Sequence, residues 1–333
     1  MPIRELALDE LVAAVRGPAG AAPWAAWARP GVVAVDLDVD DPPAPVPVPH
    51  GGVRAVVVGR TAGEPPEAHP AAAVCDVLVA PGDPALDAVA ATVDASPLAA
   101  CALAVLLRAS PCGSLDAGLT AESAVYSALQ AGPEFARWRA ARPRRSRPPE
   151  GEPVALVRDG GRLDVTLCRP QVRNALDTAM RDGLVEAFAL AAVDGSITEV
   201  HLRGDGPDFC AGGDLDEFGT FPDPATAHLV RLQQSPGRAI AAVADRVTAH
   251  LHGACIGSGI ELPAFAGTVV ADESTVVGLP EVSLGLVPGA GGTVSLPRRI
   301  GRHRTARLAL AGERIDARTA LAWGLFDAVG PVV

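Results

Sequence analysis

Two glutamates and two glycine-rich loops in the second half of the chain could act together on a substrate. Glu261 lies about one helical turn beyond the loop at residues 257–259, and Glu281 stands in an otherwise apolar stretch. This loop and the loop at residues 211–213 each place flexible backbone beside a predicted helix start, where N–H groups can bind an oxyanion or a phosphate. Two carboxylates beside such donors could deliver a water molecule and a proton. Taken singly, either loop also fits a simple turn, and either glutamate fits a surface position.

Short strands that alternate with helices must hold these residues. β-prone runs are followed by apolar residues at helical spacing over residues 174–193 and by a glycine-rich helical start at residues 257–265. This alternation indicates an α/β unit with its ligand loops at strand ends. The predicted strands are residues 154–157, 163–167, 199–203, 247–251 and 268–271.

The first half of the chain predicts a smaller α/β module without a catalytic constellation. Its predicted strands are residues 32–37, 53–58 and 77–80, and predicted helices follow from about residue 84. An Arg- and Pro-rich stretch with little apolar periodicity then marks a boundary. We therefore predict an N-terminal module at residues 1–140, a linker at residues 141–153 and a catalytic domain at residues 154–333.

Composition and charge narrow the classes of function. The chain has 333 residues, of which 49% are hydrophobic, so it can bury a large core. The net charge of −11 disfavours a nucleic-acid partner, which would require a basic surface. No apolar run is long enough for a membrane span, and the N-terminus lacks the pattern of a secretory signal. The six cysteines lie far apart and predict reduced thiols rather than a zinc site, so we expect a cytoplasmic protein.

Five spaced motifs in the second half resemble the crotonase (enoyl-CoA hydratase/isomerase) superfamily. They begin with RPQVRNALD at residue 169 and DFCAGGDL at residue 208. They continue with GxxxGxGxEL from residue 253, PEVSLGLVPGAGGT from residue 280 and a closing segment at residues 312–327. The resemblance covers about residues 152–330. It implies an α/β fold, a crotonase-like ββα spiral core with a helical cover.

The resemblance also implies roles for individual residues. The backbone N–H groups of Ala211 and Ser258 would form an oxyanion hole for the thioester carbonyl, although the family usually has glycine where Ser258 stands. Glu261 and Glu281 match the two glutamates that hold and activate water. The residues that match the coenzyme A-binding positions are Arg173, Ala175, Gly212, Gly213, Asp214 and Gly257.

Two glutamates together favour a hydratase, an enzyme that adds water across the 2,3 bond of an enoyl-CoA. Two alternatives stay open: isomerisation or a biosynthetic dehydration on the same fold, and a non-catalytic subunit that binds acyl-CoA. The expected substrate is an acyl-CoA thioester, with no metal and no redox cofactor. The resemblance further implies a homo-oligomer, either a trimer or a hexamer.

The sequence departs from the family pattern after residue 327. A usual crotonase continues there for some 60 to 70 residues through helices that cover the active site, whereas this sequence ends at Val333. Residues 74–100 and 118–138 resemble those missing helices. We therefore hypothesise that residues 1–140 are a degenerate crotonase module whose helices supply the cover, in the same chain or to a neighbouring subunit. The alternative is an unrelated N-terminal appendage.

Overall fold

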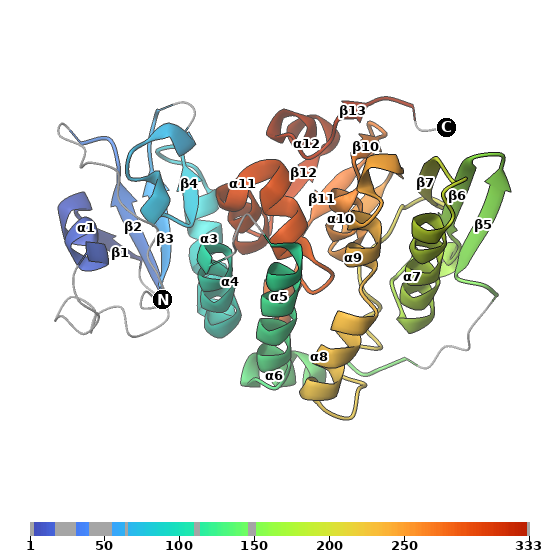
Figure 1. Ribbon diagram of the computed structural model, residues 1–333. Helices are drawn as coiled ribbons and strands as arrows, with labels where there is room; N and C mark the ends of the chain where they lie inside the picture. The colour runs from blue at the N-terminus through green and yellow to red at the C-terminus, as the bar shows by residue number, and fades with distance from the viewer. Residues whose placement is uncertain are drawn as a thin grey trace.

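The computed structural model describes residues 3–16, 31–39, 55–63, 66–109, 114–145 and 151–331. A small sheet lies at one end of the molecule and a larger sheet at the other, with helices between them (Figure 1). The small sheet comes from the first 80 residues, whereas the larger one comes wholly from residues after 153. The predicted boundary at residues 141–153 falls between them, and its residues 146–150 lie outside the described residues.

Four parallel strands form the small sheet in the order β1-β2-β3-β4. Parallel strands are normally covered on both faces and therefore consist of nearly continuous apolar runs, as β2 and β3 do here. Val32 and Val56 face the main core, while Val33 and Val57 face a second, smaller core that includes Leu11. The elements of this part are β1 (Arg4–Leu6), α1 (Leu8–Arg16), β2 (Val32–Asp36), β3 (Val56–Arg60), η1 (Pro66–Ala68), η2 (Ala72–Val74) and β4 (Val77–Val79).

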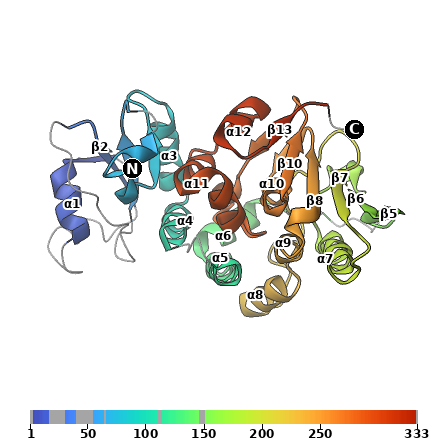
Figure 2. The ribbon, with the colours of Figure 1, turned by 45° about the horizontal axis from the view of Figure 1, so that its top comes forward.

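Four helices follow the small sheet in the chain and lie between it and the larger sheet (Figure 2). They are α3 (Ala85–Ala95), α4 (Pro97–Ala109), α5 (Leu115–Gln130) and α6 (Pro133–Ala141). Helix α5 begins at Leu115, because the Ser114 hydroxyl caps it by accepting a hydrogen bond from the Ala117 N–H. Helix α5 packs against α8 and α11 of the same chain. The first half of the chain is therefore packed on the second half through α5.

The larger sheet has six strands in the order β13-β10-β8-β7-β6-β5, and only the hairpin partner β5 is antiparallel to its neighbour. A three-stranded sheet, β12-β11-β9, lies beside it. The strands are β5 (Val154–Asp159), β6 (Arg162–Leu167), β7 (Glu199–Gly204), β8 (Val247–Leu251), β9 (Ala254–Ile256), β10 (Thr268–Ala271), β11 (Val276–Gly278), β12 (Arg314–Asp316) and β13 (Ala328–Val329).

Helices connect these strands and carry the loops that matter for the site. The predicted helix at residues 174–193 is observed four residues shorter, because residues 170–172 form a separate 3-10 turn and Asp177 caps the helix. The helices are α7 (Thr178–Val193), α8 (Pro224–Gln233), α9 (Pro236–Ala241), α10 (Ser258–Glu261), α11 (Gly292–Leu310) and α12 (Ala317–Trp323). The 3-10 turns are η3 (Pro170–Val172), η4 (Ala244–Arg246), η5 (Pro263–Phe265) and η6 (Glu281–Leu284).

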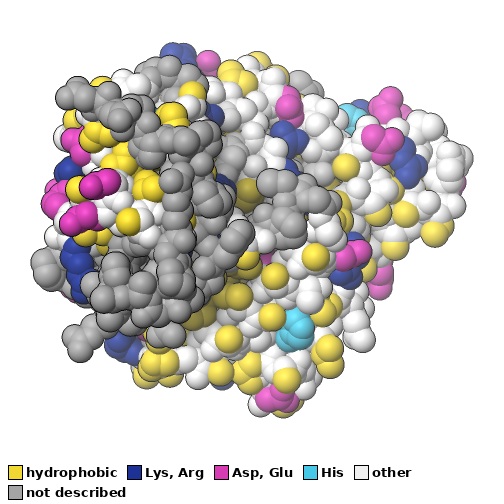
Figure 3. Space-filling view, turned by 60° about the vertical axis from the view of Figure 1, so that its left-hand side comes forward, with side chains coloured by type: hydrophobic (Ala, Val, Ile, Leu, Met, Phe, Trp, Pro, Cys, Tyr) yellow, Lys and Arg dark blue, Asp and Glu magenta, His cyan; other side chains and the backbone are white. Residues whose placement is uncertain are grey.

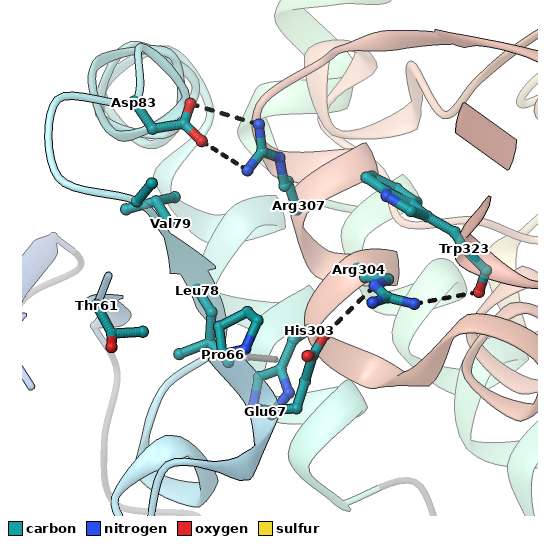
Figure 4. Close-up of a pocket in the computed structure, with 11 residues that line it drawn as sticks. Thr61, Pro66, Glu67, Leu78, Val79, Asp83, His303, Arg304, Arg307 and Trp323 are labelled. Carbon is teal, nitrogen blue, oxygen red and sulfur yellow. Dashed lines mark hydrogen bonds and ion pairs between the residues drawn. The ribbon is translucent and has the colours of Figure 1, made fainter. Parts of the chain in front are cut away.

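The small sheet is attached to α11 through a row of basic side chains around a cleft of about 280 Å3 (Figure 4). Arg307 reaches Asp83 at 2.7 Å, and Arg304 lies 3.3 Å from Glu67. His303 hydrogen-bonds to the Ala72 carbonyl at 3.0 Å. Each of these side chains is engaged by a polar partner across the cleft, so it joins the two parts of the chain.

Charged side chains of both signs lie on the exposed face of the N-terminal end. Figure 3 views this end, where acidic, basic and hydrophobic side chains are interspersed over the described residues. One exposed ion pair of this region joins Arg60 of β3 to Glu5 of β1 at 2.7 Å. Exposed pairs of this kind contribute little to stability, about 0–1 kcal/mol.

A buried ion pair holds β3, β4 and α4 together. Arg108 of α4 and Asp76 each have a side chain that is only 2% exposed, and the Arg108 Nε donates to Asp76 at 2.7 Å. The same guanidinium donates to the Ala55 carbonyl at 2.8 Å, and Asp76 accepts from the Val57 N–H at 2.8 Å. Both charges are thus paired and hydrogen-bonded, which a buried ion pair requires.

We predict that Arg108→Met lowers the free energy of unfolding by about 3–5 kcal/mol, because it leaves the Asp76 carboxylate buried without a cation. Urea denaturation followed by circular dichroism measures this change. The control is Arg60→Met, which removes an arginine of the same sheet from an exposed pair and should cost at most about 1 kcal/mol. Equal losses in the two variants would contradict the prediction.

Candidate active site

A cavity of about 130 Å3 lies beside α5, α8, α10 and η6. It brings both predicted glutamates together with one residue from each glycine-rich loop. Other lining residues come from α5, from the segment before α8 and from α8 itself. The lining residues are Tyr126, Leu176, Gly213, Phe218, Arg231, Ser258, Glu261, Glu281, Gly289 and Ala290.

Two backbone N–H groups of this lining have no acceptor among the residues that the structure describes. Ser258 is the first residue of α10, and the first N–H groups of a helix have no partner within it. Gly213 is paired with Leu176, but its two neighbours make the hydrogen bonds of this bridge. The Leu176 N–H donates to the Gly212 carbonyl, and the Asp214 N–H donates to the Leu176 carbonyl. The N–H groups of Gly213 and Ser258 are therefore free to bind an oxygen atom of a ligand.

The predicted role of Ala211 is not compatible with its hydrogen bond. The Ala211 N–H donates to the Arg173 carbonyl at 2.9 Å, and Ala211 does not line the cavity. The residue two positions later, Gly213, lines the cavity instead. The sequence located the correct loop but not the correct N–H, because the direction of each N–H depends on the turn that the loop makes.

Glu261 ends α10 and is only 2% exposed. Its Oε2 accepts from the N–H groups of Ala290 and Gly292, each at 2.8 Å. Burial raises the pKa of Glu261 to about 7, and the backbone N–H donors oppose this rise. The carboxylate is thus held in place by the loop before α11 and can exchange a proton near neutral pH.

Glu281 begins η6 and is also buried, with Oε2 lacking a hydrogen-bond partner in the described part of the chain. Burial, and then the charge of Glu261, raise the pKa of Glu281 well above its usual value. Its Oε1 lies against Gly257, where an added Cβ would be 2.3 Å from that oxygen. Gly257 has φ +54°, so both its conformation and this close approach require glycine.

A third buried glutamate, Glu122 of α5, was missed by the sequence analysis. It accepts from the N–H groups of Gly291 at 2.7 Å and Thr293 at 2.8 Å, and from the Thr293 hydroxyl at 2.7 Å. Burial, followed by the charge of Glu261, raises the pKa of Glu122 to about 8. The available signal was a carboxylate within the stretch that resembles the family's last helices, but its partner lies about 170 residues further along the chain.

Two aromatic side chains, Tyr126 of α5 and Phe218, line one side of the cavity. The Tyr126 ring meets the Phe218 ring edge-on, with centroids 6.5 Å apart. Trp138 of α6 packs on Phe135 and on Phe218, at centroid distances of 5.5 Å and 6.3 Å. Residues before position 141 thus form part of the cavity wall, which supports the hypothesis that these helices act as a cover.

The predicted coenzyme A-binding residues of the first motif lie in a turn that Asn174 fixes. Arg173 has a side chain that is 69% exposed and lies 3.5 Å from Asp208, and Ala175 is half-buried. Asn174 is fully buried and has φ +52°, a conformation that asparagine tolerates. Its side chain accepts from the Arg169 N–H and donates to the carbonyls of Asp205 and Asp208. Arg173 is thereby presented at the surface on a rigid turn.

Two other predicted binding residues have structural contacts of their own. The Asp214 carboxylate lies 3.3 Å from the Arg169 guanidinium, so the side chain faces into the fold. Gly212 has φ +103°, and a Cβ there would be 3.0 Å from the Ile256 carbonyl, so this position requires glycine. Both residues shape the loop that presents the Gly213 N–H.

The described ranges hold neither a cluster of metal ligands nor a single membrane-spanning helix. They contain no group of three or more His, Cys, Asp or Glu side chains that could hold a metal ion. The five cysteines in these ranges are free thiols, and Cys112 lies outside them. No single helix there is long and apolar enough to cross a membrane. Helices α3 and α4 reach that length and hydropathy only as a pair bent by 117°.

An α/β core with two carboxylates and two free backbone N–H groups in one cavity defines the class of this protein, the crotonase superfamily. The chain belongs to the enoyl-CoA hydratase/isomerase family, whose model matches residues 159–333. The predicted family and fold class are thereby confirmed. Glu122 and Tyr126 precede the matched segment.

Relatives with curated names, and solved structures of other proteins, are similar to about half of this chain. The chain is 38% identical over 175 residues to 2,3-dehydroadipyl-CoA hydratase of Escherichia coli (strain K12), covering 51% of this chain and 66% of that protein. The enoyl-CoA hydratase structure from Thermoplasma volcanium is 34% identical with a TM-score of 0.50, covering 54% of this chain and 72% of the other. That from Bacillus anthracis is 31% identical with a TM-score of 0.50, covering 54% and 70%. The chain spans 56–66% of the length of three relatives with curated names.

We predict that Glu122→Gln destabilises the protein more at pH 5 than at pH 8. A folded-state pKa of about 8, above the unfolded value of 4.5, means that Glu122 stabilises the fold below pH 4.5. This contribution is lost as the pH rises towards 8, at up to about 1.4 kcal/mol per pH unit. Urea denaturation of both proteins at a series of pH values measures the difference. Comparison with wild type cancels the titrating groups that do not interact with Glu122, among them His250 and His303, whose lowered pKa values act in the opposite direction.

The opposite trend, a loss that grows from pH 5 to pH 8, would contradict this assignment. It would mean that the three donors from Gly291 and Thr293 keep Glu122 ionised despite its burial. Glu273→Gln is the control, because that side chain is 75% exposed, and the variant should show no such pH dependence.

Proposed function

We propose that this protein adds water reversibly across the 2,3 double bond of an enoyl thioester of coenzyme A. The observation that carries the proposal is one cavity that contains Glu261, Glu281 and the free N–H groups of Gly213 and Ser258. The family match supports the thioester substrate, and the name of the Escherichia coli relative supports hydration.

The Gly213 and Ser258 N–H groups would bind the thioester carbonyl oxygen. When hydroxide adds at C3, negative charge moves onto this oxygen as an enolate. Donors that are already in place stabilise that charge without reorganisation, and removing one such donor from other enzymes lowers the rate by about 100- to 1,000-fold. We therefore assign the oxyanion hole to Gly213 and Ser258 in place of Ala211 and Ser258.

The two glutamates would divide the work of base and acid. Glu261 has a pKa of about 7 and receives two backbone N–H bonds, so it is the better base for taking a proton from water. Glu281 is the better acid, because its pKa is raised well above the usual value and Oε2 has no partner among the described residues. Water loses a proton to Glu261 and its oxygen bonds to C3, while C2 takes a proton from Glu281. Separated pKa values of this kind mark an acid and base pair.

Coenzyme A itself would lie outside the cavity, beside the first motif. The Arg173 side chain is exposed on the turn that Asn174 fixes, so its guanidinium is available for a phosphate. No metal or redox cofactor enters this mechanism, since the polarisation of the carbonyl falls to the two N–H groups. Product analysis separates this proposal from isomerisation, which moves the double bond without adding water.

We predict that wild-type protein consumes crotonyl-CoA with loss of the enoyl-thioester absorbance, and that Glu281→Gln lowers kcat by about 100- to 10,000-fold. KM should change little, because the carboxyl group acts on the reacting carbon. In the wild type, kcat/KM should fall below about pH 7, where Glu261 takes up a proton. Glu273→Gln, at an exposed position, is the matched control. Wild-type turnover that survives in Glu281→Gln would refute the assignment.

A second prediction concerns the Ser258 N–H. Ser258→Ala keeps the N–H and should retain turnover within a few-fold, whereas Ser258→Pro removes it and should lower kcat by at least about 100-fold. Proline is compatible with the first position of a helix, which Ser258 occupies in α10. Thermal unfolding of both variants checks that the fold is kept. Similar activity in the two variants would exclude this N–H from the oxyanion hole.

A further inference from the structure

Arg231 of α8 brings a cationic group to the wall of the cavity. Its guanidinium lies over the Tyr126 ring, 4.6 Å from the centroid. Nε donates to the Ser123 hydroxyl at 3.1 Å, and Nη2 donates to the Ser127 hydroxyl. Helix α5 thus holds the guanidinium in place, and no hydrogen bond from its Nη1 is made within the part of the chain that the structure describes.

No carboxylate neutralises this arginine among the described residues. The neighbouring acidic groups are engaged elsewhere: Asp177 lies 3.0 Å from Arg169, and Glu217 accepts from the Thr178 N–H and hydroxyl. Glu122 is the acid that acts on Arg231 through space, and its own oxygens accept from the loop before α11.

Arg181 provides a contrast on the same surface. It lines two hollows that Arg231 also lines, but its Nε and Nη2 both donate to Asp182, at 2.9 Å and 2.7 Å. Arg181 is therefore neutralised by an adjacent acid, and Arg231 is not. A partly buried cation without a counter-charge is costly, and an anionic ligand would offset that cost.

Arg231 also lies where the far end of a bound acyl chain can reach it. It lines the cavity of Glu261 and Glu281, and it lines two adjoining hollows of about 120 Å3 and 70 Å3 that share Leu176 with that cavity. An acyl chain whose C2 and C3 lie at the glutamates can therefore extend along Leu176 towards Arg231. Burial lowers the pKa of Arg231 but leaves it a cation at neutral pH.

We propose that Arg231 binds a carboxylate at the far end of the acyl chain, so that the preferred substrates are enoyl-CoA monothioesters of dicarboxylic acids. This inference rests on the proposed function, because it assigns the acyl end of the same site. A guanidinium with a free edge suits a carboxylate, which it binds by charge-assisted hydrogen bonds. The aromatic wall of Tyr126 and Phe218 packs on the methylene groups between the two ends.

The test compares trans-2-hexenoyl-CoA with its ω-carboxylate analogue of the same length. Wild type should prefer the ω-carboxylate substrate in kcat/KM by about 10- to 100-fold, and Arg231→Met should reduce this ratio to near 1. Arg231→Lys should keep part of the preference. Arg181→Met is the matched control and should keep the ratio. The ratio within one variant cancels any general loss that follows from loosening α8 against α5.

The possible failures are distinguishable. A wild-type ratio near 1, or a preference that persists in Arg231→Met, would overturn the inference while leaving the hydratase proposal intact. A uniform loss for both substrates in Arg231→Met would leave the ratio unchanged and would likewise overturn the inference. If wild type turns over neither substrate, calorimetric binding of hexanoyl-CoA and its ω-carboxylate analogue decides the inference. Equal affinities would refute it, and tighter binding of the analogue that Arg231→Met abolishes would support it.

Discussion

The site depends on how one short loop shares its N–H groups between two buried carboxylates. In the loop that leads into α11, the N–H groups of Ala290 and Gly292 donate to Glu261, and those of Gly291 and Thr293 donate to Glu122. This alternation requires small residues, since a Cβ on Gly292 would lie 2.7 Å from the Glu261 side chain. The loop therefore holds Glu261, the proposed base, on one side and Glu122 of α5 on the other. Without the N–H groups of the loop, neither carboxylate could be buried.

This arrangement makes helix α5 part of the candidate site rather than an accessory to it. The family match begins at residue 159, yet Glu122 and Tyr126 of α5 precede it and contact the loop and the cavity. One hydrophobic core runs from Val56 of the small sheet to Phe326 near the end of the larger unit. Along the chain, the helix that covers the cavity therefore precedes the segments that carry Glu261 and Glu281. The two predicted parts are joined by packing as well as by the chain.

The sequence was informative where a motif determines its own local structure. Glu261, Glu281 and Ser258 lie in the cavity as predicted, because each follows a glycine or proline turn that sets its direction, and most strands were located to within two residues. The prediction that the Ala211 N–H lies in the oxyanion hole was wrong, because the direction of an N–H depends on the partner that closes the turn, here the Arg173 carbonyl. Glu122 and Arg231 were missed because their roles arise from contacts between α5, α8 and the loop before α11. Such contacts join segments about 100 to 170 residues apart and leave no periodic signal.

Three buried carboxylates and a partly buried guanidinium in one region would be a poor way to stabilise a protein, since each charge loses hydration. The structure meets most of this cost with hydrogen bonds from within the fold: backbone N–H groups for Glu122 and Glu261, and two serine hydroxyls for Arg231. Among the residues that line the cavity, the groups left without partners in the described part of the chain are Glu281 Oε2, one edge of Arg231 and the N–H groups of Gly213 and Ser258. Each is a donor, an acceptor or a charge that an enoyl thioester with an acidic end could complete. The polar groups that this region leaves unsatisfied are therefore the groups that would bind the proposed substrate, and this correspondence links the stability of the free protein to its specificity.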